Sequence, residues 1–240
     1  MQAILYVAHG SRVEKSNQQA IELIERVINK VDVPIQEVCF LELREPLIEA
    51  GITSCVKRGA TKVAVVPLLL LEAAHAKVDI PQAVRLAHQK YPHLTISYGK
   101  PIGVHEKMIA LIHERIQELI KRKPQDTAVL LIGRGSSDES QTADIKSIGS
   151  LLQQRFGYES VDVCFITAAR PTVEEGLQQL RARSEAYKVV MPYLLFSGTL
   201  IRQLQGTVKE IPLCDTLGGH PFIEDVLIDR IKETIQEGVK

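Results

Sequence analysis

Short runs of hydrophobic residues alternate with longer amphipathic segments along the chain. In the first half, four hydrophobic runs occupy residues 4–8, 38–43, 63–71 and 94–98. Between the first two runs, hydrophobic residues recur every three or four positions, which predicts a helix, at Ala20, Leu23, Ile24, Val27, Ile28 and Val31. Runs that are hydrophobic on both faces are typical of parallel strands covered by helices. The alternation therefore predicts an α/β fold with doubly wound parallel sheets.

The second half of the chain repeats the first at a constant offset of 125 residues. The aligned blocks are 4–11 with 129–136, 38–40 with 163–165, 65–70 with 190–195, and Pro46 with Pro171. Gly103 and His105 match Gly218 and His220 at an offset of 115, so the second half is expected to lack about ten residues of loop. General similarity between strands does not explain glycines, cysteines and prolines at one spacing. The sequence thus predicts two similar halves related by a pseudo-twofold repeat, with a cleft between them.

Residues 121–127 form the predicted boundary between the halves. This segment is charged, contains Pro124, and separates a predicted helix at 108–120 from a predicted strand at 128–132. We therefore predict an N-terminal α/β half at residues 1–123 and a C-terminal α/β half at residues 124–240.

Composition narrows the classes of protein to which the chain can belong. Of its 240 residues, 45% are hydrophobic and 24% are charged, and the formal net charge is zero, so no nucleic-acid partner is expected. The first residues lack the basic segment of a signal peptide, and the longest hydrophobic run, at 63–71, is too short to cross a bilayer. These features predict a cytoplasmic protein without a membrane partner. The four cysteines show no paired spacing, which favours reduced core residues.

Three residues with metal-binding side chains follow successive predicted strands. His9 follows the first strand, Glu42 ends the second, and His75 lies just past the third. In doubly wound sheets the first strand lies between the second and the third, and ligands bind beyond the carboxyl ends of the strands. The three side chains are therefore predicted to converge on one point.

The repeat sharpens this prediction, because the aligned positions of the second half hold no usual metal ligand. These positions are Arg134, Thr167 and Leu200, and an arginine has no lone pair to offer. We predict one divalent-metal site in residues 1–123, with residues 124–240 forming the opposing wall of the cleft and Arg134 facing an anionic ligand. Two imidazoles and one carboxylate suit Fe²⁺, Co²⁺, Ni²⁺ or Zn²⁺ and leave coordination positions open.

The remaining histidines are expected to have structural roles. His88, His93 and His113 fall in polar helical surroundings. His105 and His220 are paired by the repeat and begin predicted helices, where a ring nitrogen can form an ordinary hydrogen bond.

Two short glycine-containing loops precede predicted helices. Gly10 and Ser11 form the first loop, and residues 133–138 form the second. Backbone N–H groups in such loops bind anions, but neither loop matches a nucleotide-binding signature. The hydroxyls of Ser11, Ser136 and Ser137 either cap helices or bind substrate carboxylates. Hydrolase chemistry is disfavoured, because the sequence has no nucleophile elbow.

Several of these segments together resemble the class II sirohydrochlorin chelatases. The resemblance lies in residues 6–12, 40–42 and 65–71, in Ala74 with His75, and in residues 133–138 and 192–196, so it covers nearly the whole chain. It is strongest to the two-repeat bacterial sirohydrochlorin ferrochelatases of siroheme synthesis, whose relatives insert cobalt in cobalamin synthesis. It implies that His9 and His75 bind the metal, that Glu42 lies close to it, and that a tetrapyrrole is held between the halves.

The resemblance implies insertion of a divalent metal, Fe²⁺ or Co²⁺, into sirohydrochlorin, with the metal as a substrate and no permanently bound cofactor. The macrocycle must lose two inner N–H protons as the metal enters, so a base is required near the ring centre. A neutral imidazole is available at physiological pH. We assign His9 as principal base and ligand and His75 as second ligand, while Glu42 either ligates the metal or accepts the released proton.

The substrate is expected to contact residues at the ends of the predicted strands. The expected contacts are Ser11, Arg12, Arg44, Leu70, Leu71, Glu72, Ala73, Ala74 and Arg134, with Lys15 and Lys77 as further partners for carboxylates. Aromatic residues make up 5% of the chain and tryptophan is absent, so stacking on the ring is limited. Tyr193 and Phe196 are the aromatic side chains expected to touch it, the alternative for both being a place in the core.

Two other functions are compatible with the sequence. A metallochaperone or a bilobed binding protein would hold a metal or small molecule without turnover. A protohaem-type ferrochelatase shares a duplicated scaffold, but it is less favoured because the histidines and the glutamate here lie in the N-terminal half alone.

Overall fold

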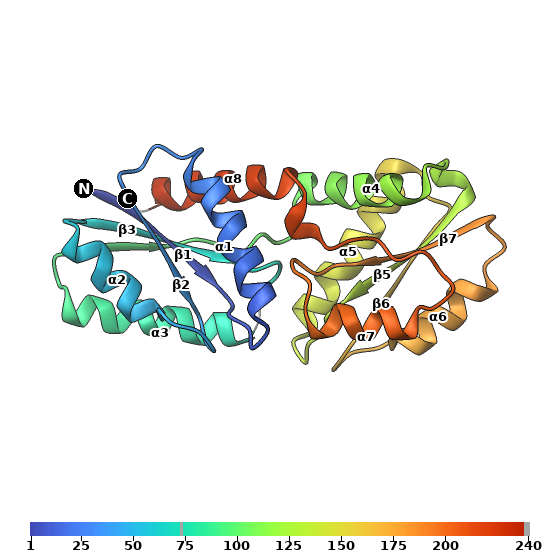
Figure 1. Cartoon of the computed structure of the whole chain (residues 1–240), viewed down its shortest axis with the longest axis horizontal. Helices are drawn as coiled ribbons and strands as arrows, with labels where there is room; N and C mark the ends of the chain where they lie inside the picture. The colour runs from blue at the N-terminus through green and yellow to red at the C-terminus, as the bar shows by residue number, and fades with distance from the viewer. Residues whose placement is uncertain (73, 238–240) are drawn as a thin grey trace. The chain divides into compact units, whose positions relative to one another are not determined.

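The computed structural model describes residues 1–72 and 74–237, and for residues 74–76 it describes the backbone alone. In this part of the chain, strands and helices alternate and form two compact units, which Figure 1 shows. The first unit contains Met1–Gly103 and the segment that begins at Glu224, and the second contains Val104–Ile223. The strands of both sheets are parallel, so the predicted α/β fold is confirmed.

The first unit contains the strands β1 (Gln2–Ala8), β2 (Ile35–Phe40), β3 (Lys62–Leu68) and β4 (Thr95–Tyr98), and the helices α1 (Glu14–Ile28), α2 (Ile48–Lys57), α3 (Ala74–Lys90) and α8 (Phe222–Glu237). The sheet has the order β2-β1-β3-β4, which places β1 between β2 and β3 as predicted. Ala3, Leu5 and Val7 of β1 share a core cluster with residues of α2 and α3. Because side chains alternate along a strand, Ile4 and Tyr6 point to the opposite face, which α1 covers.

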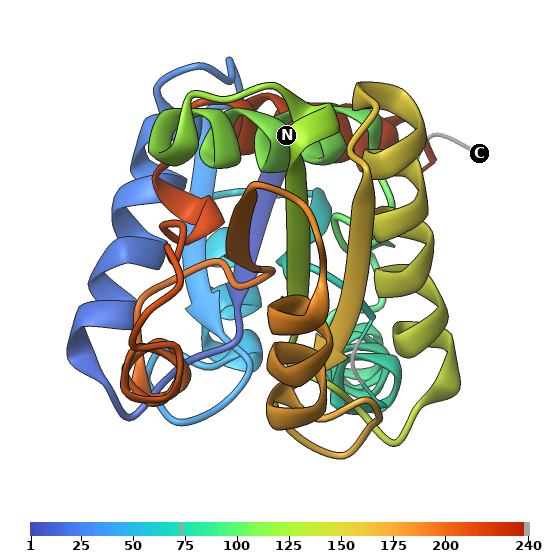
Figure 2. The same cartoon turned by 90° about the vertical axis from the view of Figure 1, so that its right-hand side faces the viewer.

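The second unit contains the strands β5 (Thr127–Gly133), β6 (Ser160–Phe165) and β7 (Tyr187–Pro192), the helices α4 (Glu106–Ile120), α5 (Glu139–Phe156), α6 (Val173–Ala182) and α7 (Thr199–Thr207), and the 3-10 turns η1 (Pro124–Asp126) and η2 (Leu217–Gly219). The sheet has the order β6-β5-β7. Leu130 and Ile132 of β5 share a core cluster with residues of α6 and α7. Helix α5 lies on the other side of these strands, as Figure 2 shows. Each unit is therefore a sheet with helices on both faces.

The last helix of each sequence repeat belongs to the compact unit of the other repeat. Helix α4 follows β4 in the chain, yet its buried residues pack with α5 and β7 of the second unit. Helix α8 is the last element of the second repeat, yet Glu224 bonds to Arg26 Nε at 2.6 Å and Lys30 Nζ at 2.7 Å in the first unit. The compact units therefore differ from the predicted division at 1–123 and 124–240 by the exchange of one helix. The repeat gives the order of the elements but does not say which sheet an amphipathic helix covers.

Backbone hydrogen bonds reproduce both offsets of the repeat. In the first half, Ile102 N–H donates to Leu69 O and Gly103 N–H to Leu70 O. In the second half, Leu217 N–H donates to Leu194 O and Gly218 N–H to Leu195 O. The carbonyls are shifted by 125 residues from the first pair and the N–H groups by 115. Most of the missing residues belong to a helix and not to a loop, since α3 has 17 residues and α7 has 9. The segment aligned with β4 is present and pairs with β7 through an isolated bridge between Val190 and Leu213, so the shorter helix accounts for most of the change of offset.

The four cysteines are buried and free, which confirms the predicted core role. Burial raises the pKa of Cys55, Cys164 and Cys214 to about 12, so these groups are thiols at neutral pH. Within residues 1–72 and 74–237, no helix has both the length and the hydrophobicity needed to cross a membrane.

Candidate metal-binding site

The loops that follow β1 and β2 are joined by backbone hydrogen bonds that continue the pairing of the two strands. Leu41 N–H donates to Ala8 O at 2.8 Å, and Glu42 N–H donates to His9 O at 3.1 Å. These bonds fix the backbone of His9 beside that of Glu42, two residues beyond the end of β2. The predicted neighbourhood of the two residues is therefore present.

Gly10 allows the two loops to approach this closely. Its φ is +89°, in the left-handed region, and a Cβ atom at this position would lie 1.8 Å from Glu42 O. A side chain is excluded by both the backbone conformation and the contact. The glycine after His9 is therefore required by the geometry that places His9 next to Glu42.

The side chains of His9 and Glu42 also face one another. His9 Nδ1 lies 3.5 Å from Glu42 Oε1, and the two side chains are 28% and 51% exposed. His9 Nε2 is buried and has no hydrogen-bond partner in the part of the chain that the structure describes. A neutral imidazole has one donor and one acceptor nitrogen, so the carboxylate can orient one while the other remains available to a metal or a proton.

His75 belongs to the first turn of α3, the helix that follows β3. Its side chain and that of Ala74 lie outside the described residues, as does Ala73 entirely. Among the described side chains, no group of three or more histidine, cysteine, aspartate or glutamate residues is placed to hold a metal. The participation of His75 with His9 and Glu42 therefore stays a prediction.

Exposure to solvent increases along the residues that precede α3. Leu70 and Leu71 are half-buried and Glu72 is exposed. Leu70 O accepts the N–H of Gly103 at 2.8 Å, and Lys77 Nζ lies 3.9 Å from a carboxylate oxygen of Glu72. The segment is thus fixed to the sheet at Leu70, while Glu72 lies at the surface.

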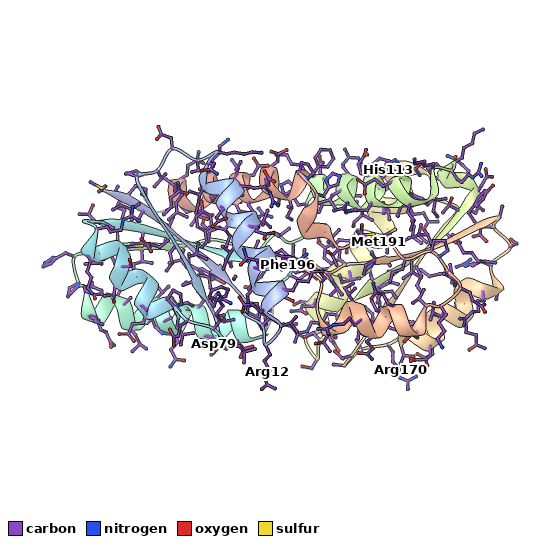
Figure 3. The ribbon with its side chains drawn as sticks, in the orientation of Figure 1. Arg12, Asp79, His113, Arg170, Met191 and Phe196 are labelled. Carbon is purple, nitrogen blue, oxygen red and sulfur yellow. The ribbon has the colours of Figure 1, made fainter. Side chains whose placement is uncertain are left out.

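The two arginines of the first unit that are predicted to bind substrate differ in their contacts. Arg12 is exposed and projects outward just before α1, as Figure 3 shows. Arg44 donates to both carboxylate oxygens of Glu14, and its guanidinium lies 5.4 Å from the centre of the Phe40 ring. The hydrogen bond from Arg44 holds the pKa of Glu14 below its usual range. Arg44 can therefore bind a substrate carboxylate only by sharing or leaving Glu14.

The loop serines form turns in front of the helices, and neither caps a helix directly. Ser11 Oγ accepts the N–H of Val13 at 3.0 Å, and Ser136 Oγ accepts the N–H of Asp138 at 3.0 Å. Asp138 is the residue that caps α5, because its carboxylate accepts the N–H of Ser140. Ser137 is exposed. Of the two predicted roles, capping is wrong for Ser11, Ser136 and Ser137, and carboxylate binding stays a prediction.

Asn17 holds the loop of His9 in place, although the sequence pattern did not single it out. It is 4% exposed, and its side-chain amide donates to Ser11 O at 2.8 Å. Its spacing in the sequence could have indicated this role, because Asn17 lies on the same buried face of α1 as Ala20 and Ile24. A polar side chain on a buried face needs a hydrogen-bond partner.

The second unit has the same loop backbone without metal ligands. Arg134 is exposed, and its carbonyl oxygen accepts the N–H of Thr167 at 2.9 Å. Gly135 has a φ of +87°, and a Cβ there would lie 1.8 Å from Thr167 O. Leu200 lies in α7. The two loops therefore share a geometry and differ in chemistry.

Three other histidines, His105, His113 and His220, have ordinary structural partners. His105 Nδ1 accepts the N–H of Lys107, and His220 Nδ1 accepts the N–H of Phe222, both at 3.2 Å, which confirms the predicted structural role. His113 stacks on the ring of Phe156, and burial lowers its pKa.

The two aromatic residues expected to touch a substrate differ in position. Tyr193 is 2% exposed and lies in the core, so its predicted contact with a ring is wrong. It directly follows β7, and its N–H still donates to Ile132 O, so the side chain is kept inside the unit. Phe196 is half-buried.

Comparison with known proteins gives a family for this arrangement. The family model described as CbiX matches residues 3–119 and 128–234, once in each repeat. A sirohydrochlorin ferrochelatase of Priestia megaterium is 42% identical and covers 97% of this chain and 90% of its own length. A sirohydrochlorin cobaltochelatase of the same organism is 36% identical and covers 100% and 82%. The solved structure of SirB from Bacillus subtilis with Fe3+ is 42% identical and covers 97% of this chain and 95% of that chain, with a TM-score of 0.91. The chain therefore belongs to the CbiX family, in agreement with the predicted resemblance to the sirohydrochlorin chelatases.

Proposed function

We propose that this protein inserts a divalent metal ion, Fe²⁺ foremost and Co²⁺ also accepted, into sirohydrochlorin. The observation that carries the proposal is the pair formed by His9 and Glu42 at the carboxyl end of the first sheet, with a buried ring nitrogen that has no partner among the described residues. Support also comes from the relatives, which are named as ferrochelatases and cobaltochelatases of sirohydrochlorin over nearly the whole chain. The metal is a substrate in this reaction.

His9 has the geometry for a residue that holds the metal and takes a proton. The carboxylate of Glu42 beside Nδ1 favours the tautomer with its proton on that nitrogen, which leaves the lone pair on Nε2. That lone pair can bind the arriving metal, and after transfer it can accept one of the protons that leave the macrocycle. His75 supplies the second ligand, and Glu42 ligates the metal or accepts the other proton.

A loose site suits a metal that must be handed on. The separation of 3.5 Å between His9 and Glu42 leaves the two side chains without a tight hydrogen bond. Few protein ligands and open coordination positions allow the ring nitrogens to replace the side chains one at a time. Arg12 and Arg134, both exposed, are the arginines proposed to meet substrate carboxylates; Arg44 joins them only if it leaves Glu14.

Turnover tests the reaction directly. The purified protein is mixed with sirohydrochlorin and Co²⁺, and metallation is followed by absorbance after subtraction of the spontaneous rate. A chelatase yields many equivalents of metallated ring for each chain, whereas a binding protein or metallochaperone saturates near one metal per chain. The same assay with protoporphyrin separates a protohaem-type ferrochelatase from the proposed enzyme.

Variants test the site assignment separately from the reaction. The rate of metallation is expected to fall in His9→Ala, Glu42→Gln and His75→Ala. The loss for His9→Ala is expected to be about 100-fold or more, the size typical of losing a positioned acid–base group. Thr167→Ala is the matched control, since it changes the residue aligned with Glu42 in the other repeat and has no proposed contact with the substrate. Near-normal rates in all three variants would overturn the site while leaving the reaction in place.

A further inference from the structure

Two leucines in the loop that joins β2 to α2 occupy positions where leucine is disfavoured. Leu43 has a φ of +64°, in the left-handed region that residues with a Cβ rarely adopt, and its side chain is 53% exposed. Leu47 is the N-cap residue of α2, makes no side-chain capping bond, and is 39% exposed. Leucine is among the poorest residues at an N-cap, because it has no oxygen to accept a backbone N–H.

The second repeat contains the same loop with residues that follow the preferences. Ala168 has the left-handed conformation there, with a φ of +54°. Thr172 caps α6 through a complete capping box with Glu175. Both alanine and threonine also keep less hydrophobic surface in water than leucine does.

The backbones of the two loops are otherwise alike. Phe40 N–H donates to Pro46 O at 2.8 Å, and Phe165 N–H donates to Pro171 O at 2.9 Å. An isolated bridge joins the same strand end to the N-cap residue in each repeat. The scaffold therefore accepts alanine and threonine at the two positions, and the leucines are not required for the loop to form.

Single exposed leucines are common on protein surfaces and need no explanation. Here two of them fall within five residues of one loop, with Leu43 directly after Glu42 of the candidate metal site and Leu47 four residues later. Local rules that are broken together at one place indicate a functional constraint at that place. The loop is also held rigid, because Arg44 between the two leucines is fixed to Glu14 and lies over Phe40.

We propose that Leu43 and Leu47 form a hydrophobic contact surface for the macrocycle of the tetrapyrrole substrate, beside Glu42. This inference rests on the proposed function and adds positioning residues to it. A tetrapyrrole has a flat hydrophobic ring with carboxylates at its rim, and covering exposed leucine side chains with that ring releases water from both surfaces. A rigid loop adds to the affinity, because little conformational freedom is lost on binding.

The test replaces each leucine by the residue that the second repeat carries at the aligned position. Leu43→Ala and Leu47→Thr are compared with Leu86→Ala, a control on α3 with the same exposed fraction, 53%, as Leu43. Affinity is measured by titrating the protein with metal-free sirohydrochlorin, and Co²⁺ affinity is measured without the ring. We expect the Kd for sirohydrochlorin to rise roughly tenfold in each loop variant, the size expected when most of a leucine's burial is lost.

Two further readouts distinguish contact from a structural role. Co²⁺ affinity is expected to be unchanged, and the Tm of Leu47→Thr is expected to rise by about 2–4 °C, because the new hydroxyl caps α2. Unchanged Kd values for sirohydrochlorin in both loop variants would overturn the inference even if turnover is normal. Weaker binding of the ring in these variants, with Leu86→Ala unaffected, would support it even if the wild-type protein failed to turn over, a result that would count against the proposed reaction alone.

Discussion

The loops that follow β1 and β5 have matching backbone hydrogen bonds around different side chains. Glu42 N–H donates to His9 O in the first, and Thr167 N–H donates to Arg134 O in the second. A left-handed glycine follows in both loops, and a Cβ atom added to either would lie 1.8 Å from the neighbouring carbonyl oxygen. The geometry of the strand ends therefore belongs to the duplicated scaffold, whereas the capacity to bind a metal depends on the side chains that each loop carries.

Replacing the loop glycines gives the largest expected effect and tests whether the scaffold is equally demanding in both repeats. Gly10→Ala and Gly135→Ala are each expected to lower the free energy of unfolding by about 3–4 kcal/mol, because a Cβ would overlap a backbone carbonyl oxygen. Urea unfolding measures the loss. Gly59→Ala is the control, since Gly59 has a φ of +91° but no atom within 4 Å of the added Cβ, and we expect about 1 kcal/mol there. Equal losses at Gly10 and Gly59 would show that the close approach does not hold the loop.

Metal-linked stability tests the chemical side of the comparison. With free Co²⁺ at 100 times its Kd, the wild-type protein is expected to gain about 2.7 kcal/mol in the free energy of unfolding. Arg134→Ala should retain this gain, and His9→Ala should lose most of it at the same metal concentration, because His9 is the proposed ligand and Arg134 has no lone pair to bind a metal. Unfolding with Co²⁺ and after chelation with EDTA gives the two values. The same gain in both variants would place the metal away from His9.

The exchanged helices provide a smaller test. Glu224 of α8 is buried and bonded to Arg26 and Lys30, whereas the aligned residue of α4, Ile109, is buried without a charge. We expect Glu224→Gln to cost about 1–2 kcal/mol, the lower part of the range for bonds to a charged group, because Arg26 and Lys30 are half exposed. Urea unfolding of wild type and variant at pH 7 gives this difference.

The same residue predicts a dependence on pH. Burial alone would raise the pKa of Glu224, but hydrogen bonds from Lys30 and Arg26 hold it below its usual range. The folded protein therefore binds this proton less readily than the unfolded chain does, so the stabilisation is present above about pH 4.3 and is lost as the pH falls through the lowered pKa. As the pH is lowered from 5, the free energy of unfolding should fall more steeply for the wild type than for Glu224→Gln. Parallel curves for the two proteins would contradict this account of α8.

The capping histidines give the smallest expected effect. His105→Ala and His220→Ala should each cost about 0.5–1 kcal/mol, since each removes one acceptor for a backbone N–H at a helix start. Neither should change the rate of metallation or the affinity for Co²⁺. A large loss of metallation in either variant, with stability intact, would mean that the site extends beyond His9, Glu42 and His75.

Much of the fold could be predicted because it depends on local pattern and on one offset. Continuous hydrophobic runs indicated parallel strands, and the usual order of a doubly wound sheet put His9 beside Glu42, where the structure has them. The exchange of α4 and α8 could not be predicted, because an amphipathic stripe shows that a helix is covered but not by which sheet.

The details of the site depend on contacts between residues far apart in the sequence. Arg44 pairs with Glu14, thirty residues away, and nothing local indicates that partner. Tyr193 follows a strand, where a polar aromatic side chain can face either the ligand or the core, and packing placed it in the core. The significance of Leu43 became visible only when its backbone conformation could be compared with that of Ala168.

The exchange of helices also limits what can be removed from this chain. Helix α8 carries Val226, Leu227 and Ile231 into the first unit, and α4 supplies a matching hydrophobic face to the second. A chain cut back to either repeat would lose one of the helices that cover its sheet and would leave its own last helix without the sheet on which it packs. In this chain, each repeat therefore depends on the other for the cover of its hydrophobic surfaces.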